Sequence, residues 1–328
     1  MRILIADDYQ DAVRHLPCFA RLQAHSVQVL TALAPDRATF LRRAAEAEAL
    51  VLIRERTRID AALLAQLPTL RLISQTGRIG EHIDLAACTA RGVAVAEGVG
   101  SPVAPAELTW ALLMAASRRL PGYRHALLAG HWQVTGDAQL GRSLDGLTLG
   151  IWSYGKIGRR VAAYGRAFGM QVQVWGSEDS CAQARADGFA VAASREALFA
   201  ESDVLSLHRR LAAATRHQIG LDDLLRMKPD ALLVNTSRAE LLAPGALLAA
   251  LDAGRPGQAA LDVFDQEPVL DPQHPLLQHP RVLATPHIGY VEQASYDLYF
   301  GTAFDNVLAF AAGTPQRLAN PEVLSARG

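Results

Sequence analysis

Short apolar segments alternate with longer amphipathic ones through the first hundred residues of the chain. The apolar segments predict β-strands at residues 3–6, 27–30, 50–53, 70–75 and 93–96. The segments between them, such as 36–47 and 60–67, are rich in Ala, Leu and Arg and repeat their apolar residues with the period of a helix. Because strands that alternate with helices build a parallel sheet covered by helices, we expect an α/β doubly wound fold here.

The same alternation begins again after a long helical stretch at about residues 105–130. It predicts a second parallel sheet, with strands at 147–152, 171–175, 204–207, 231–235, 258–261 and 282–284. The turn-rich segment 101–105 marks the passage between the domains, and residues 292–312 predict a helix that returns to the first domain. We therefore expect one domain from residues 1–101 and 292–328, with a second domain, residues 102–291, inserted into it.

The composition disfavours several classes of partner. The 328 residues carry 32 Lys+Arg and 33 Asp+Glu, so no overall positive field attracts nucleic acid or anionic lipid, and we expect neither. Cys18, Cys88 and Cys181 lie far apart, and because no His or Cys stands at ligand spacing we expect no metal site. The absence of a secretory signal and of an apolar stretch of membrane-spanning length predicts a soluble cytoplasmic protein with no membrane partner.

A glycine-containing turn joins the predicted strand 147–152 to a helical pattern at 159–168. It reads SYGKIG at 153–158, which is the G-x-G-x-x-G pattern of dinucleotide-binding loops with serine in place of the first glycine. Gly155 would let the backbone approach a pyrophosphate, and Gly158 would let the helix pack close to the strand. Ser153 must then hold a backbone conformation that glycine adopts more easily. On this motif alone, a turn without a ligand is the alternative.

The acidic residue that usually binds the adenosine ribose of NAD is missing from the end of the next strand. Strand 171–175 ends at Gly176, and Glu178 follows two positions later. Either Glu178 binds the ribose hydroxyls, or the missing acid admits the 2′-phosphate of NADP, with positive charge from Arg209 and Arg210. Because both arginines are equally well explained as solvated surface residues, the choice between NAD and NADP stays open.

Three ionisable residues follow strands of the second sheet: Arg238, Glu267 and His287. In an open α/β sheet, ligands bind outside the carboxyl ends of the strands, so all three would face the cofactor. Each one alone is more simply explained as structural or solvated. Their joint placement favours a catalytic site.

The order and spacing of these motifs resemble the D-isomer-specific 2-hydroxyacid dehydrogenases, a family that includes phosphoglycerate, glycerate, formate and D-lactate dehydrogenases. The resemblance covers nearly the whole chain. It rests on LGI at 149–151 before GKIG at 155–158, SLH at 206–208, NTSR at 235–238, LDVF at 261–264 with EP at 267–268, and TPHIG at 285–289. It implies a Rossmann cofactor domain inserted into a flavodoxin-like substrate domain, and a dehydrogenase that uses NAD or NADP.

The resemblance also implies a role for each ionisable residue. Hydride would move between the nicotinamide and C2 of a small D-2-hydroxy or 2-keto acid, while His287 moves the hydroxyl proton as general acid–base. Glu267 would hold the imidazole in orientation, and Arg238 would bind the substrate carboxylate and carbonyl with its planar fork. Asp262 would contact the nicotinamide carboxamide. Further cofactor contacts are expected from Tyr154, Gly155, Lys156, Ile157, Gly158, Ser177, His208, Arg209, Thr215, Thr236, Ser237 and Gly289.

The first domain should bind the substrate carboxylate with backbone amides of the turn after strand 70–75. The candidates are Gly77, Arg78 and Ile79. Arg78 stands where the family usually has a small residue; it would either add a second cation for a dicarboxylate or phosphorylated acid, or point into solvent. Arg54 is a weaker candidate of the same kind.

Three residues depart from the family pattern without removing a catalytic group: Arg210 for a proline, Ala239 for a glycine and Glu292 for a helix-capping threonine. These departures indicate a side branch of the family, so the substrate of a relative cannot be assigned to this chain.

The alternative function is a dinucleotide-sensing, corepressor-like binding protein on the same fold. It is disfavoured because the chain has neither a long tail nor a low-complexity arm. A transferase that uses the loop for another nucleotide leaves the ionisable residues unexplained.

The helical stretch at 105–130 carries more apolar surface, including Trp110 and Met114, than one sheet face needs. Together with the family resemblance, this surface predicts a homodimer formed through the cofactor domains. Burial of the same residues within one chain is the alternative.

Overall fold

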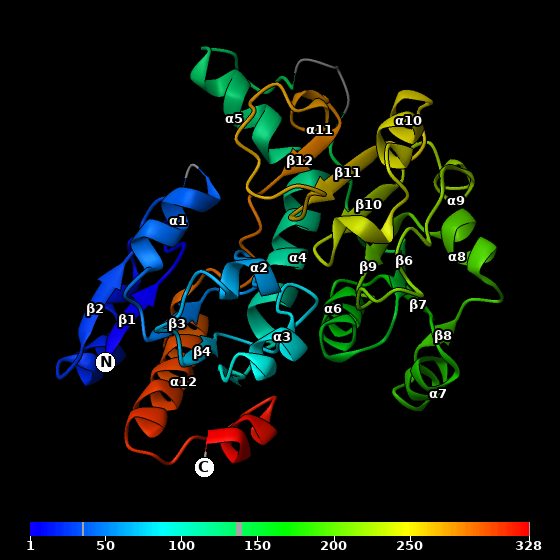
Figure 1. Cartoon of the computed structure of the whole chain (residues 1–328). Helices are drawn as coiled ribbons and strands as arrows, with labels where there is room; N and C mark the ends of the chain where they lie inside the picture. Colours follow the sequence, from blue (N-terminus) through cyan, green and yellow to red (C-terminus); the bar gives the residue numbers. More distant parts are fainter. Residues whose placement is uncertain (35, 136–139, 328) are drawn as a thin grey trace. The chain divides into compact units, whose positions relative to one another are not determined.

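The computed structural model describes residues 1–34, 36–135 and 140–327, and it contains two compact α/β units (Figure 1). The first unit comprises Met1–Ser101 and Val291–Gly328, and the second comprises Pro102–Tyr290. Within the described residues, every pairing between named strands is parallel. The expected fold class, two doubly wound parallel-sheet units, is confirmed.

The sheet of the first unit has, in the described residues, five strands in the order β2-β1-β3-β4-β5. This is the order of flavodoxin-like sheets. The strands are β1 (Arg2–Ile5), β2 (Ser26–Val29), β3 (Ala49–Leu52), β4 (Leu72–Gln75) and β5 (Ala94–Ala96). The helices are η1 (Val13–His15), η2 (Pro17–Leu22), α1 (Arg37–Ala44), α2 (Ala61–Leu64), α3 (Leu85–Ala90), α12 (Gln293–Ala311) and η4 (Pro321–Arg327).

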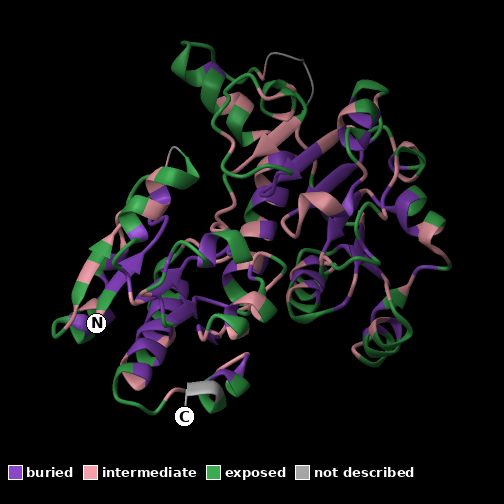
Figure 2. Ribbon diagram, in the orientation of Figure 1, coloured by how far each residue is buried: buried purple, intermediate pink, exposed green. Residues whose placement is uncertain are grey.

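Helices cover both faces of this sheet, which explains why its strands are continuous apolar runs. On one face Leu50 joins a core with Phe40 of α1 and Leu63 of α2. On the other face lies α12, and the buried Ser74 hydroxyl of β4 donates a hydrogen bond to the Ala303 carbonyl, 2.9 Å away. Strands β3, β4 and β5 and most of β1 are accordingly buried, whereas the edge strand β2 is exposed or half-buried, as are the outer faces of the helices (Figure 2).

The sheet of the second unit has, again in the described residues, seven strands in the order β12-β11-β10-β9-β6-β7-β8. With β6 counted as the first strand, this is the Rossmann order extended by one strand. The strands are β6 (Thr148–Trp152), β7 (Gln171–Trp175), β8 (Ala190–Val191), β9 (Val204–Leu207), β10 (Leu232–Asn235), β11 (Gln258–Leu261) and β12 (Val282–Ala284). The helices are α4 (Val103–Ser117), α5 (Leu120–Leu128), α6 (Lys156–Ala167), α7 (Glu178–Ala186), α8 (Arg195–Glu201), α9 (Leu221–Leu225), η3 (Ala239–Leu241), α10 (Ala246–Asp252) and α11 (Pro275–Gln278).

Successive residues of the central strands alternate between two cores in this unit. On β10, Leu232 and Val234 face the core that includes α4 and α6. Leu233 faces the opposite core, which includes α8, α9 and α10. Because helices cover both faces of the sheet, the central strands do not alternate apolar with polar residues. Only their length and the turns that flank them identified them as strands in the sequence.

The helical stretch expected at 105–130 is two helices, so that prediction was wrong in detail. α4 ends at Ser117 and α5 begins at Leu120, because Arg119 adopts a left-handed conformation with φ of 53°. Trp110 packs on Phe168, with ring centroids 4.9 Å apart, and on Tyr164 at 5.9 Å. The apolar surface of α4 that suggested a dimer is therefore used within the unit, against α6 and the residue that follows it.

Glu292 caps α12 in spite of standing where the family usually has threonine. Its carboxylate accepts hydrogen bonds from the amides of Ala294, at 2.8 Å, and Ser295, at 2.6 Å. These two amides belong to the first turn and have no acceptor within the helix. The departure from the family pattern keeps the capping function with a longer acidic side chain.

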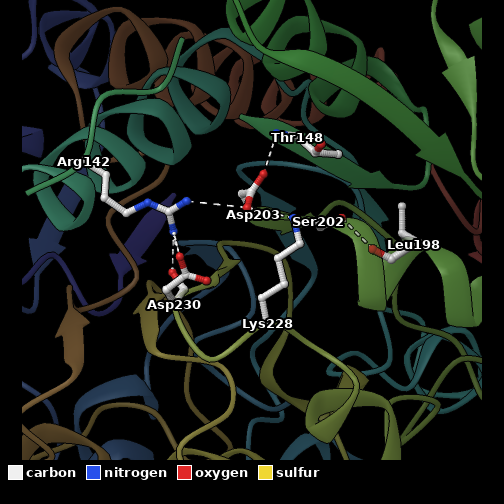
Figure 3. Close-up of polar contacts among 7 residues, drawn as sticks. All are labelled: Arg142, Thr148, Leu198, Ser202, Asp203, Lys228 and Asp230. Atoms are coloured by element: carbon white, nitrogen blue, oxygen red, sulfur yellow. Dashed lines mark hydrogen bonds and ion pairs between the residues drawn. The ribbon is translucent and has the colours of Figure 1, made fainter. Parts of the chain in front are cut away.

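A polar network joins the amino ends of three strands of the second unit (Figure 3). Asp203, just before β9, accepts a hydrogen bond from the Thr148 amide of β6 at 2.8 Å and from Lys228 Nζ at 2.8 Å. Arg142 lies 3.5 Å from Asp203 and donates to the carbonyl of Asp230, before β10, at 2.7 Å. The network lies at the opposite end of the sheet from the carboxyl ends of the strands, where ligands bind.

Candidate active site

The turn between β6 and α6 has the backbone that a phosphate-binding loop needs. Ser153 has φ of 76°, so the left-handed conformation expected at this non-glycine position is confirmed. A Cβ added at Gly158 would collide with the carbonyl oxygen of Ser153, so glycine is required there by the protein itself. A Cβ added at Gly155 would meet no heavy atom of the described chain within 4 Å. The open space beside Gly155 is what the close approach of a pyrophosphate requires.

The same turn leaves backbone donors for an anion. The amides of Gly155, Lys156, Ile157 and Gly158 make no hydrogen bond to any residue that the structure describes. The first bond of α6 runs from the Arg159 amide to the Gly155 carbonyl. A helix N-terminus with unused amides is a preformed site for a phosphate group. These residues therefore fit a dinucleotide through their main chain.

Tyr154 contributes to this loop differently from the other expected cofactor contacts. Its side chain is buried and its hydroxyl donates to Asp187 Oδ2 at 2.9 Å, in the segment after α7. The side chain therefore anchors the loop, and only the backbone of Tyr154 is available to a ligand. Asp187 was not among the residues that the sequence indicated, since nothing in its local pattern shows a contact 33 residues away.

Residues 176–178 after β7, which we call the ribose segment because they are expected to bind the adenosine ribose, leave little room for an acidic side chain at position 176. A Cβ there would lie 3.1 Å from the Cβ of Ser180, so a larger side chain would require Ser180 to move. Ser177 is the N-cap of α7, and its hydroxyl oxygen accepts from the Ser180 amide. Glu178 is the first residue of α7 and is exposed. Glu178 thus supplies an accessible carboxylate at this end of the strand.

The loop after β9 carries three residues that were expected to contact the cofactor: His208, Arg209 and Thr215. Burial lowers the pKa of His208 to about 4, and its Nε2 lies 2.9 Å from the Ser206 hydroxyl. Thr215 is buried, and its hydroxyl bonds to backbone groups of its own loop. The Arg209 carbonyl accepts a hydrogen bond from Ser237 at 2.6 Å. His208 is therefore neutral near pH 7, whereas a group that acts as both proton donor and acceptor there must titrate close to that pH.

The loop that carries Arg238 is held by three side chains of its own and neighbouring segments. The Asn235 side chain accepts from the Ser237 amide at 3.1 Å and donates to the Arg238 carbonyl at 3.0 Å. Thr109 Oγ1 of α4 lies 2.6 Å from Thr236 Oγ1 and 2.7 Å from the Pro105 carbonyl. Because Thr109 has one hydrogen and Pro105 offers only an acceptor, Thr236 donates to Thr109 in this arrangement. Thr109 is a buried contact that the sequence did not indicate.

Asp262 fixes the backbone of the His287 loop. Its Oδ1 accepts from the Thr285 hydroxyl at 2.6 Å and the Ile288 amide at 2.8 Å, and its Oδ2 accepts from the Gly289 amide at 2.9 Å. Burial raises the pKa of Asp262, and these hydrogen bonds oppose that effect. A carboxylate has about four acceptor positions, and three are used here. Because Asp262 has no exposed surface, its contact with a carboxamide stays a prediction.

His287 and Glu267 form a close pair at the carboxyl end of the sheet. Nδ1 of His287 lies 2.5 Å from Glu267 Oε2, and Glu267 Oε1 accepts from the Phe264 amide at 2.9 Å. The side chain of His287 is 25% exposed, and its ring makes an edge contact with Tyr290 at 5.9 Å. With Nδ1 engaged, Nε2 is the nitrogen that remains for proton transfer.

The first unit places Arg54 and Gly77 next to each other. Arg54 has φ of 53°, and its guanidinium occupies the space that a Cβ at Gly77 would need. The amides of Gly77 and Arg78 have no hydrogen-bond acceptor among the described residues, and Arg78 is exposed. The amide of Ile79 donates to Glu97 Oε1 at 3.0 Å. The turn thus offers two amides, with the third taken by a glutamate that the sequence did not single out.

Two features were not found among the described residues. No group of three or more His, Cys, Asp or Glu side chains in residues 1–34, 36–135 and 140–327 is arranged to hold a metal ion. Within the same ranges, no helix is both long enough and apolar enough to cross a bilayer.

Comparison with known proteins adds independent information. The model of the "D-isomer specific 2-hydroxyacid dehydrogenase, NAD binding domain" matches residues 110–289. A glyoxylate reductase from Aeropyrum pernix is 39% identical over 300 residues, covering 89% of each chain. The crystal structure of a phosphoglycerate oxidoreductase from Vibrio cholerae is 54% identical, with a TM-score of 0.93, covering 95% of this chain and 99% of that one. The D-lactate dehydrogenase of Aquifex aeolicus, complexed with NAD and lactic acid, is 28% identical with a TM-score of 0.76.

Proposed function

The chain belongs to the D-isomer-specific 2-hydroxyacid dehydrogenase family, and on that premise we propose that it interconverts a small 2-keto acid and the corresponding D-2-hydroxy acid with NAD or NADP. The observation that carries this proposal is the contact of 2.5 Å between His287 and Glu267. It lies at the end of a sheet that also carries a phosphate loop with open space at Gly155. The bound dinucleotide supplies or accepts the hydride.

The protein's own groups handle the proton and the carboxylate. In the reductive direction, His287 gives the proton on Nε2 to the carbonyl oxygen while C2 receives the hydride, so the carbonyl becomes a hydroxyl. Glu267 keeps Nδ1 engaged and thereby directs Nε2 outward. Arg238 pairs with the substrate carboxylate and orients the carbonyl. In the oxidative direction, the neutral imidazole takes the hydroxyl proton back.

A substrate screen tests the reaction class. Glyoxylate, hydroxypyruvate, pyruvate and longer 2-keto acids are incubated with the enzyme and either NADH or NADPH, and loss of the reduced cofactor is followed by absorbance. We expect at least one keto acid to be reduced, with a D-configured product wherever C2 is a stereocentre. Formation of an L-hydroxy acid, or no turnover with any keto acid while the cofactor binds tightly, contradicts the proposal.

The cofactor preference is proposed from the charges around the ribose segment. Gly176 carries no carboxylate, but Glu178 is exposed and close in sequence, and it favours ribose hydroxyls over a 2′-phosphate. Arg210 is exposed and would favour the phosphate. Parallel titrations with NADH and NADPH separate the two, and Glu178→Gln should move the ratio of the two dissociation constants toward NADPH. Arg210→Ala should move it toward NADH.

On the substrate side, we propose that the amides of Gly77 and Arg78 bind the substrate carboxylate, with Arg54 as a weaker candidate of the same kind. Two unused amides and an adjacent guanidinium suit a carboxylate or another anionic group. The Ile79 amide is not included, because it donates to Glu97. If Arg78 recognises a second anionic group, Arg78→Ala should lower kcat/KM for a dicarboxylic keto acid and leave pyruvate unaffected. Equal losses for both substrates would remove that role.

We also propose a homodimer, which now rests on the end of the stretch 105–130 and on Trp132 rather than on Trp110 and Met114. Leu127, Leu128 and Trp132 are 57%, 71% and 77% exposed, and they lie on α5 and just after it. Clustered exposed apolar side chains of this size mark an interaction surface. Leu128→Glu combined with Trp132→Ala should convert a dimer into a monomer by analytical ultracentrifugation. A wild-type monomer at micromolar concentration excludes the proposal.

A further inference from the structure

A buried tyrosine anchors the phosphate loop to the far end of the neighbouring helix. Tyr154 lies between the left-handed Ser153 and Gly155, and only 5% of its surface is exposed. Its ring makes an edge contact with Phe189, with centroids 5.9 Å apart. Its hydroxyl donates to Asp187 Oδ2 at 2.9 Å.

Asp187 receives hydrogen bonds from three separate elements. Besides Tyr154, Arg159 of α6 donates to Oδ2 at 3.0 Å, and Gln183 of α7 donates to Oδ1 at 3.0 Å. The hydrogen bond from Tyr154 is the main cause that lowers the pKa of Asp187. Burial raises the pKa of Tyr154 to about 12, with Asp187 adding to the effect. Near neutral pH the carboxylate is therefore charged and the hydroxyl protonated, so the hydrogen bond is charge-assisted.

The position of Asp187 along α7 gives this contact a functional meaning. Asp187 follows the last residue of α7, whereas Ser177 and Glu178, at the expected ribose segment, stand at its first turn. The helix thus gives the ribose segment a second connection to the phosphate loop, in addition to the hydrogen bond from the Ser153 amide to the Trp175 carbonyl at 2.7 Å. The loop also needs such an anchor, since a left-handed serine costs about 1–2 kcal/mol and relaxes unless its surroundings hold it.

We propose that Tyr154 and Asp187 are positioning residues for the dinucleotide: their contact sets the phosphate-loop amides in register with the ribose segment on α7. This inference rests on the proposed function, because it presumes that a dinucleotide binds at Gly155–Gly158. Neither side chain touches the ligand. They act through the backbone of residues 153–158, so they affect cofactor affinity and leave the proton chemistry of His287 unchanged.

The test compares Tyr154→Phe with a control variant, Tyr164→Phe, which changes a tyrosine on the following helix α6. Tyr154→Phe removes one hydroxyl and keeps the ring on Phe189, and Tyr164→Phe on α6 removes a hydroxyl from a ring that packs on Trp110. Dissociation constants for NADH and NADPH are measured by calorimetry, and KM and kcat with the best keto acid. For Tyr154→Phe we expect affinity for the preferred cofactor to fall about 3- to 10-fold, with kcat within about twofold. Tyr164→Phe should bind like the wild type.

Asp187→Asn provides a second, independent variant. Asparagine replaces the charged acceptor by a neutral one, so it weakens the hydrogen bond from Tyr154 and also the pairing with Arg159. If the contact between Tyr154 and Asp187 is the cause, the affinity loss in the double variant Tyr154→Phe/Asp187→Asn should be smaller than the sum of the two single losses. Additive losses, or unchanged cofactor affinity in Tyr154→Phe, overturn the inference. The proposed function fails differently: wild-type protein would then bind neither NADH nor NADPH.

Discussion

Glu267 bridges the backbone of its own turn and the ring of His287. One carboxylate oxygen accepts from the Phe264 amide at 2.9 Å, and the other lies 2.5 Å from Nδ1 of His287. The backbone bond fixes the carboxylate, and the carboxylate fixes the ring. His287 itself has φ of 52°, a conformation that its loop must enforce, and Asp262 does so through Thr285, Ile288 and Gly289. One buried acid, Asp262, and one exposed acid, Glu267, thus determine where one imidazole nitrogen points.

His287→Ala should lower kcat for keto-acid reduction by about 10²- to 10⁴-fold, the usual contribution of general acid–base catalysis. The dissociation constant for the reduced cofactor should change little, because the phosphate loop and ribose segment are untouched. Steady-state kinetics and cofactor titration measure the two quantities. Near-normal turnover in this variant would falsify the assignment of His287, and His208 cannot replace it, since its pKa of about 4 keeps it neutral.

Arg238→Lys should lower kcat/KM for the keto acid by about 10- to 100-fold. Lysine keeps the positive charge but loses the planar fork that pairs with a carboxylate through two hydrogen bonds. The Arg238 side chain also donates to the Ser237 carbonyl at 2.7 Å, a bond that a lysine amine can also make, and Asn235 holds the backbone of residue 238, so we expect the loop to survive. An unchanged kcat/KM, with normal cofactor binding as the control, would remove Arg238 from the substrate site.

Gly155→Ala and Gly158→Ala separate ligand binding from folding. A methyl group at Gly155 meets no described atom within 4 Å, so the variant should keep wild-type thermal stability and bind the cofactor at least about 10-fold more weakly. A methyl group at Gly158 collides with the Ser153 carbonyl, so that variant should unfold at a lower temperature. If Gly155→Ala binds NADH and NADPH as tightly as wild type, the space beside Gly155 does not hold the pyrophosphate.

Ser153→Gly should stabilise the second unit. The left-handed conformation costs serine about 1–2 kcal/mol, and glycine recovers this while losing about 0.5–1 kcal/mol of unfolded-state entropy. The net gain in the free energy of unfolding is about 0.5–1 kcal/mol, measured by urea denaturation. A loss of stability would show instead that the serine hydroxyl makes a contribution larger than its backbone strain.

Asp203→Asn should destabilise the second unit by about 2 kcal/mol at pH 7, because it weakens a hydrogen bond to charged Lys228. Burial alone would raise the pKa of Asp203, but the hydrogen bonds from Lys228 and the Thr148 amide hold it below its ordinary value. The folded state therefore prefers the charged carboxylate. Its contribution is fully present above the unfolded pKa of about 4 and is lost as the pH falls through the lower folded pKa.

The difference between wild type and Asp203→Asn should accordingly shrink when denaturation is repeated at acidic pH. Asp230→Asn serves as the comparison, because the Asp230 side chain is 63% exposed and its pairing with Arg142 is screened by solvent. A difference that stays constant down to pH 3 would contradict the charge-based account of this network.

Local pattern was sufficient for most of the strands and for the positions of the chemical groups, but it missed the short strand β8 (Ala190–Val191). Continuous apolar runs marked the strands, and His287, Glu267 and Arg238 could be placed because parallel strands present their carboxyl ends at one edge of a sheet. The loop motif predicted a left-handed backbone at position 153, although serine stands there in place of glycine, and the structure has that backbone. The pattern failed where one helix was expected at 105–130: Arg119 breaks the helix, and Pro121 in the first turn of α5 was a boundary signal that the prediction did not use.

Tertiary structure alone decided the contacts that orient these groups. The side chain of Tyr154 turns to Asp187, the Ile79 amide is taken by Glu97, and Thr236 bonds to Thr109, with partners far away in sequence. No local period encodes such pairs, because each depends on which backbone donor or acceptor the packing of other elements leaves within about 3 Å. The sequence by itself determined which ionisable and hydroxyl groups follow the ends of the strands, and packing determined which of their atoms already have a partner within the chain.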